Sequence, residues 1–167
     1  MNASLTPYTC CFTGHRFLPK EHLPALSALL DRTMEILIKS HVTVFRAGGA
    51  LGFDTMAALK VIDFRTRFPE LRLELCLPCR GQENGWSKLA QQTYADILSR
   101  ADKITYLHER YTTGCMHERN RFLVDGSQFC VGFCTSDKGG SAYTLRYAEQ
   151  QGLRVINLAS LLANEKF

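Results

Sequence analysis

The sequence lacks any long hydrophobic run. No apolar stretch among its 167 residues reaches the roughly 18 residues that a membrane span requires. The first residues, Met1 to Pro7, are polar and lack the basic-then-apolar pattern of a secretion signal. We therefore expect a cytoplasmic protein with no membrane association.

Signals for disulfides and metal sites are also missing. The seven cysteines are an odd number, and several lie inside apparent strands, where free cysteine packs as a small apolar residue. Cys76 and Cys79 form a C-x-x-C pair, but no second cysteine or histidine pair follows at zinc-site spacing. We expect reduced thiols, no metal and no required cofactor.

Runs of basic residues, internal repeats and low-complexity stretches are absent too. Hydrophobic residues make up 46% and charged residues 22% of the chain, which is typical of one globular domain and predicts a single domain over residues 1–167. The net charge of +4 comes from scattered lysines and arginines without interleaved aromatics. This pattern argues against a dedicated nucleic-acid surface and leaves room for a local anion site.

What the chain does have is a regular alternation of short apolar runs with segments of helical period, which predicts βαβ units. The expected strands are Tyr8–Thr13, Val42–Ala47, Leu71–Leu77, Lys103–Leu107, Gln128–Phe133 and Arg154–Leu158. The expected helices are Leu23–Ser40, Phe53–Phe68, Trp86–Arg100, Cys115–Asp125 and Ser141–Gln151, with a short last helix near Ser160. The prediction is one Rossmann-like, doubly wound α/β domain with a mainly parallel sheet, strand order 3-2-1-4-5 and helices on both faces.

Loops at the carboxyl ends of such strands are where ligands bind. The first glycine-rich loop contains Gly48, Gly49 and Gly52 and runs from the second strand into a helix. Adjacent glycines permit a tight turn and a close approach to a ligand, and the helix start attracts an anion. Asp54 could hold a ribose hydroxyl, or it could simply cap the helix.

A polar tetrapeptide, Thr13-Gly14-His15-Arg16, follows the first strand directly. An arginine there can make a bidentate contact with a phosphate, while Thr13 and His15 can each form a hydrogen bond. The alternative is a solvated connecting loop.

The second glycine-rich loop, Lys138-Gly139-Gly140-Ser141, opens the fifth expected helix. It repeats the combination of a glycine pair, a helix N-terminus and a hydroxyl, all suited to phosphate. The alternative is a turn in which Ser141 caps the helix.

The fourth segment includes Glu118, Arg119, Asn120 and Arg121. Glu118 and Arg121 are spaced for an intrahelical ion pair. The functional interpretation places Arg119 and Asn120 at the ligand pocket. Trp86, which follows a polar loop, is a candidate for stacking on a base or for plugging the core.

Taken together and in their order along the chain, these segments resemble the YpsA family of the SLOG superfamily, which also contains DprA/Smf and the LOG phosphoribohydrolases. The matching pieces are Thr13–Arg16, Gly48–Asp54, the Pro78…Gln82-Glu83…Trp86 loop, Ala101-Asp102, Arg119-Asn120 with Val124–Ser127, and Gly139–Thr144. The resemblance covers residues 8 to 158. It implies a Rossmann-like sheet and a nucleotide-derived ligand, such as a nucleotide or an ADP-ribose-type molecule, at the strand C-termini.

The sequence departs from the LOG enzymes at their P-G-G-x-G-T-x-x-E motif. Arg146 occupies the position of the glutamate, and Lys138 that of the proline. A guanidinium stays protonated and cannot act as a general base.

The leading hypothesis is therefore a binding or sensor domain for a nucleotide or nucleotide-derived phosphorylated ligand, with a regulatory role. Such a role also allows a homo-oligomer or a regulatory protein partner. One alternative is a nucleotide-processing hydrolase with Glu118 or Asp54 as acid or base. A second alternative is single-stranded DNA binding as in DprA/Smf, which needs a basic groove with stacking aromatics.

Overall fold

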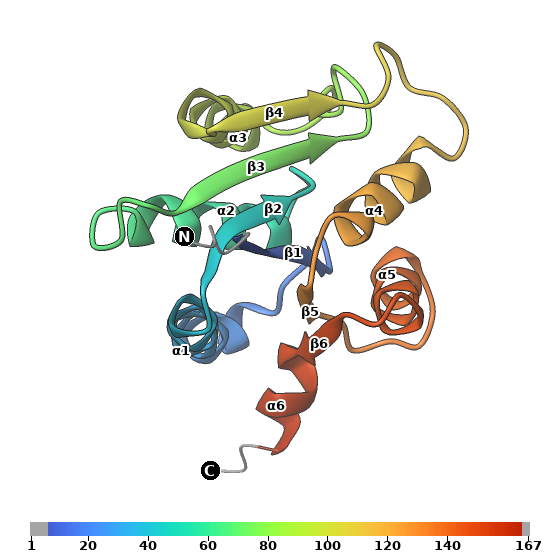
Figure 1. The fold of residues 1–167 in the computed structure, drawn as a ribbon. Helices are drawn as coiled ribbons and strands as arrows, with labels where there is room; N and C mark the ends of the chain where they lie inside the picture. The colour runs from blue at the N-terminus through green and yellow to red at the C-terminus, as the bar shows by residue number, and fades with distance from the viewer. Residues whose placement is uncertain (1–6, 165–167) are drawn as a thin grey trace, which may run out of the picture.

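The structure, a computed structural model, describes residues 7–164 and contains a six-stranded sheet in the order β4-β3-β2-β1-β5-β6 (Figure 1). The strands are β1 (Tyr8–Gly14), β2 (Val42–Ala47), β3 (Arg72–Leu77), β4 (Lys103–Tyr106), β5 (Phe129–Phe133) and β6 (Arg154–Asn157). The helices are α1 (Leu23–Lys39), α2 (Phe53–Phe64), α3 (Lys88–Arg100), α4 (Cys115–Asp125), α5 (Gly140–Gln150) and α6 (Leu158–Asn164), with a 3₁₀ turn at Lys20–His22. Every strand pair is parallel. The predicted Rossmann-like α/β fold is confirmed; the predicted domain also included residues 1–6 and 165–167, which lie outside the described residues.

The central strands are buried on both faces. β1 has the sequence YTCCFTG, and its residues from Thr9 to Thr13 are all buried. It pairs with β2 on one side and with β5 on the other, where Cys11 lies opposite Cys130. A strand covered on both faces reads as a continuous apolar run, so the run in the sequence located it correctly.

Helices cover both faces of the sheet, as expected. The larger core lies under α1, α2, α3 and α6 and is filled by aromatic and aliphatic side chains such as Phe12, Phe45 and Phe53. Helices α4 and α5 lie next to each other (Figure 1). The smaller core lies under them and contains Cys11, Cys130 and Leu123. All seven cysteines are buried and free.

The predicted strand order is wrong at one strand. The fourth expected strand was placed next to the first, but β4 lies at the edge of the sheet beside β3. Lys103 and Ile104 are accordingly exposed. The chain then crosses back through α4 to β5, which takes the position beside β1. The direction of winding therefore reverses between β1 and β5, and α4 is the crossover helix.

Helix boundaries shift by a few residues where local capping decides them. α3 begins at Lys88 rather than Trp86, because the Ser87 hydroxyl accepts a hydrogen bond from the Ala90 amide at 3.2 Å. α2 ends at Phe64 rather than Phe68. Among the helices of residues 7–164, none combines the length and apolar character needed to cross a bilayer.

Candidate functional site: a cationic cavity at the carboxyl end of β1

A cavity of about 320 Å³ opens at the carboxyl end of β1, where the winding direction of the sheet reverses. Four segments line it: the end of β1 with its following loop, the start of α2 with the residues before it, the first turns of α4, and the loop into α5. The lining residues are Phe12, Thr13, Gly14, His15, Arg16, Ala50, Asp54, Met116, His117, Arg119, Asn120, Lys138, Gly139, Gly140 and Ser141. The cavity thus brings together one part of each of the four segments that the sequence singled out.

Arg119 forms the inner wall and is only 5% exposed. Its guanidinium donates to the Gly48 carbonyl and, through Nε, to the Asn120 side-chain oxygen at 2.9 Å. Burial lowers the pKa of Arg119, and the nearby Asp54 carboxylate opposes that shift. A buried guanidinium held in this way provides a fixed positive charge at the base of the cavity.

Asp54 lies beside Arg119 and is equally buried. Its carboxylate accepts a hydrogen bond from the Ala50 amide at 3.3 Å. Burial raises the pKa of Asp54, and the charges of Arg119 and Arg16 only partly offset this effect. Asp54 therefore stabilises the loop before α2 and does not cap the helix. The N-cap residue is Gly52, and no side chain makes a capping hydrogen bond there.

The glycines of the first glycine-rich loop are packed against protein atoms rather than exposed to the cavity. An added Cβ at Gly48 would lie 2.6 Å from the Arg119 guanidinium, and one at Gly49 would lie 2.6 Å from Leu77. Gly52, with a φ of 78°, lies directly against the backbone carbonyl groups of His15 and Arg16. None of these three glycines lines the cavity; Ala50 and Asp54 represent this loop there.

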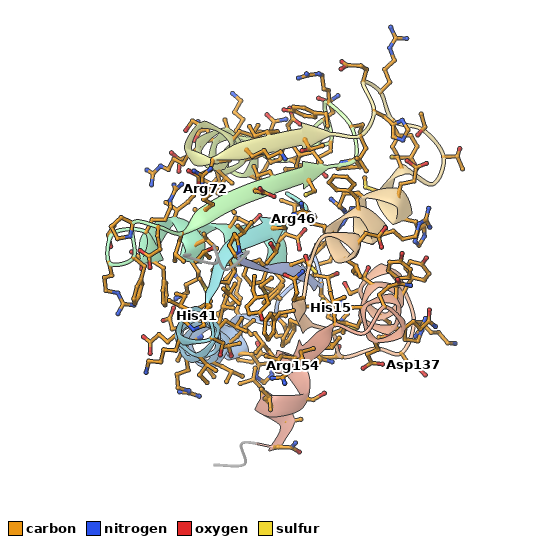
Figure 2. The ribbon with its side chains drawn as sticks, viewed as in Figure 1. His15, His41, Arg46, Arg72, Asp137 and Arg154 are labelled. Atoms are coloured by element: carbon orange, nitrogen blue, oxygen red, sulfur yellow. The ribbon has the colours of Figure 1, made fainter. Side chains whose placement is uncertain are left out.

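The loop after β1 is fixed by backbone hydrogen bonds on both sides. The His15 amide donates to the Phe133 carbonyl at 3.1 Å, and the His15 carbonyl accepts from the Phe53 amide at 3.0 Å. The His15 ring lies at the carboxyl end of β1 (Figure 2), and its Nε2 accepts from the Thr135 amide at 2.8 Å. Because a backbone amide can only donate, the neutral ring carries its proton on Nδ1. Arg16, next in the chain, is exposed at the cavity mouth.

The second glycine-rich loop opens onto the cavity without any internal partner at the helix end. Gly139 is the N-cap of α5, with a φ of 95°, and no side chain caps this end. Ser141 therefore does not cap the helix, which was the alternative interpretation of this loop. Nothing lies within 4 Å of a Cβ added at Gly139, and only Asn120 at 3.9 Å approaches one at Gly140. The first-turn amides of α5, which the helix itself cannot satisfy, therefore border open space beside Lys138.

Besides the three glycines of the first glycine-rich loop, two further candidate residues lie outside the cavity. Glu118 pairs with His108, with 2.6 Å between Oε2 and Nε2, and its side chain is 46% exposed. Trp86 packs against the larger core and meets the Tyr94 ring edge-on at 5.4 Å. Sequence reasoning named neither Met116 nor His117 as site residues. Met116 lies three residues before Arg119 and His117 three residues before Asn120, and this helical spacing was the signal that could have identified them.

No group of three or more His, Cys, Asp and Glu side chains within residues 7–164 is arranged to hold a metal ion. The charged side chains that line the cavity are Arg16, Arg119 and Lys138 and one carboxylate, Asp54.

Comparison with known proteins identifies a family for this chain. Residues 17–161 match the YspA SLOG family (family model YpsA). The chain belongs to this family. It is 25% identical over 143 residues to the SPbeta prophage-derived protein YoqJ of Bacillus subtilis, covering 76% of this chain and 84% of that protein. It is also 32% identical over 131 residues to a UPF0398 protein of Shouchella clausii, covering 77% of this chain but only 65% of that longer protein.

A solved structure with a similar fold corrects one expectation. DNA processing protein A of Helicobacter pylori, described for its single-stranded DNA binding mode, superimposes with a TM-score of 0.64 and 19% identity. The match covers 95% of this chain and 73% of that one. The modest net charge and the scattered basic residues argued against a dedicated nucleic-acid surface, so nucleic acid was not expected as a partner and was kept only as the second alternative. That expectation does not hold, because a protein of this fold binds single-stranded DNA, and net charge does not report how cations cluster in the tertiary structure.

Proposed function

We propose that this protein is a binding domain for a nucleotide or nucleotide-derived phosphorylated ligand, with the phosphate in the cavity at the end of β1. The observation that carries the proposal is the meeting of Arg16, Lys138 and the buried Arg119 with the uncapped N-terminus of α5 in one cavity. Positive side chains and free helix amides together are the usual components of a phosphate site.

The fixed parts of the cavity favour binding over chemistry. Arg119 is held by Gly48 and Asn120, and His15 is held by Thr135. The Nδ1–H of His15 can donate to an anion, while its Nε2 already accepts from the Thr135 amide. A preorganised set of donors of this kind binds a phosphate with little loss of side-chain entropy.

The hydrolase alternative has weaker support. Glu118 is paired with His108 outside the cavity, and Arg146, which replaces the LOG glutamate, donates to the Asp137 carbonyl at 2.8 Å. Asp54 is the only carboxylate among the lining residues. We therefore expect no release of free base from AMP on incubation with the protein.

The test is a titration with pyrophosphate, AMP, ADP-ribose and NAD, followed by calorimetry and thermal unfolding. A ligand at 100 times its dissociation constant should stabilise the protein by about 2.7 kcal/mol. Arg16→Ala and Lys138→Ala should each weaken binding of every phosphorylated compound. Arg80→Ala is the matched control, because Arg80 is an exposed arginine paired with Glu109 at 2.9 Å outside the cavity. Binding unaffected by either cavity variant would refute the proposal.

A second candidate ligand is the backbone of a single-stranded nucleic acid. The favouring observation is the fold shared with the Helicobacter protein, together with three exposed residues, Arg16, His117 and Lys138, around one cavity mouth. A twelve-nucleotide oligothymidylate added to the same titration separates the two candidates. Tighter binding of the oligonucleotide than of any mononucleotide, with affinity falling steeply as salt increases, would favour the nucleic acid.

A further inference from the structure

Phe17 is the most exposed large hydrophobic side chain of residues 7–164, with 87% of its surface accessible. It directly follows Arg16, which lines the cavity. An aromatic ring almost wholly in water adds nothing to the hydrophobic core and is available to stack on a molecule bound beside it. Phe17 itself is not among the lining residues, but its place next to Arg16 in the chain puts its backbone at the cavity mouth.

The loop that presents Phe17 is held in place rather than loose. Before Phe17 in the chain, the backbone of His15 is hydrogen-bonded to the backbones of Phe133 and Phe53. After it, Leu18 packs against the larger core. Gly52 lies tightly against the Arg16 carbonyl from below. The backbone therefore has no internal space into which to withdraw, and the ring stays at the surface in the free protein.

We infer that Phe17 is a stacking platform for the base of a nucleotide whose phosphate occupies the adjacent cavity. This inference rests on the proposed function and adds the part of the ligand that the cavity does not hold. A nucleotide carries an anionic phosphate and a flat aromatic base in one molecule. The Arg16 guanidinium can pair with the phosphate, and the neighbouring Phe17 ring can stack on the base. Arg119 and Lys138 supply further charge for the phosphate but no aromatic surface.

A phenylalanine ring has no hydrogen-bonding group, so Phe17 would recognise the face of a base and not its edges. Base–aromatic stacking of this kind tolerates any base and gains strength with ring size. The expected preference is therefore AMP and GMP moderately above UMP. Trp86, the only tryptophan, does not compete for this role because it packs against Tyr94 and the core.

The decisive comparison uses AMP and ribose 5-phosphate, which share phosphate and sugar and differ only in the base. We expect wild-type protein to bind AMP more tightly. Phe17→Leu, which keeps an apolar side chain but removes the ring, should weaken AMP binding by about 5- to 150-fold and leave ribose 5-phosphate unchanged. Phe17→Trp should retain AMP binding, and AMP but not ribose 5-phosphate should quench the fluorescence of the new tryptophan.

Tyr111→Leu is the matched control, because Tyr111 is another exposed aromatic residue, at 67%, and, unlike Phe17, is not next to a lining residue in the chain. It should change neither affinity. Equal wild-type affinities for AMP and ribose 5-phosphate, or an unchanged AMP affinity in Phe17→Leu, would overturn the inference while leaving the phosphate site intact. Failure of both compounds to bind would overturn the proposed function with it. Concentration-dependent self-association abolished by Phe17→Leu, without any effect on AMP, would identify a second copy of the chain as the partner instead.

Discussion

The two glycine-rich loops have the same sequence pattern, a glycine pair before a helix, but they differ in whether protein or solvent surrounds them. The loop before α2 is turned inward: the Gly48 carbonyl accepts from Arg119, and Gly52 lies against the loop after β1. The loop before α5 is exposed from Lys138 to Gly140, and no side chain caps the helix.

The difference lies in what the rest of the chain brings to each loop. The Asp54 carboxylate accepts from the Ala50 amide, and the His15 carbonyl accepts from the Phe53 amide, so two donors at the start of α2 are already used within the protein. No side chain does this at Gly139. A pair of glycines before a helix therefore predicts a close backbone approach, and only the packing decides whether protein or ligand makes that approach.

The largest expected effect comes from Arg119→Met, which removes the side chain that ties the inward loop to α4. In this variant the Gly48 carbonyl and Asp54 stay buried but lose their positive partner. We expect the free energy of unfolding to fall by about 3 kcal/mol or more as a result. Urea denaturation measures it. Arg146→Met, at an exposed arginine, should stay within about 0.5 kcal/mol of wild type. Equal stabilities of the two variants would show that Arg119 does not anchor the loop.

The second effect compares Gly52→Ala with Gly139→Ala. Both positions have positive φ, but only at Gly52 would the new Cβ clash with backbone, at the His15 and Arg16 carbonyl groups. We expect a loss of about 3 kcal/mol at Gly52 and about 1 kcal/mol at Gly139. Thermal unfolding of the two variants side by side checks this ranking, and a reversed order would contradict the assignment of Gly52 to the interior.

Gly140→Ala tests the outward loop for binding without disturbing the fold. Its Cβ would meet only Asn120 at 3.9 Å, and a helical alanine costs no strain, so stability should stay within about 0.5 kcal/mol. A methyl group beside the free amides should weaken pyrophosphate binding about tenfold, as expected for one lost hydrogen bond to a charged group. Calorimetry measures this change. An unchanged affinity would move the phosphate away from α5.

The smallest effect is a pH dependence set by Asp54. Burial raises its pKa above the ordinary value near 4, so the carboxyl is neutral in acid and ionises as the pH rises through the raised pKa. Over that range the unfolding free energy should fall relative to Asp54→Asn, because a raised pKa stabilises the fold only below it. Sulfate binding should weaken about fivefold over the same pH range, because the ionised Asp54 carboxylate repels the bound anion. Sulfate titrations of both proteins from pH 4 to 8 measure it, and identical profiles would remove Asp54 from the cavity's electrostatics.

The sequence by itself determined the alternation of strands and helices, because burial on both faces of a parallel sheet leaves a continuous apolar run at each central strand. β2 was predicted at its observed bounds, Val42–Ala47, and β1 to within one residue. Strand order was not predictable in the same way. The position of β4 depends on which face α4 covers as it crosses back, and contacts between distant segments decide that.

The same division holds for the site. The sequence identified Arg16, Arg119 and Gly140, because glycine pairs, charged residues and helix starts are local signals, and the structure brings these three together. Only the tertiary structure decided that Gly48, Gly49 and Gly52 face inward and that Glu118 pairs with His108. The physical reason is that an amide or a charge takes whichever partner comes within hydrogen-bond distance. For these residues that partner lies far away in the sequence, or on another element.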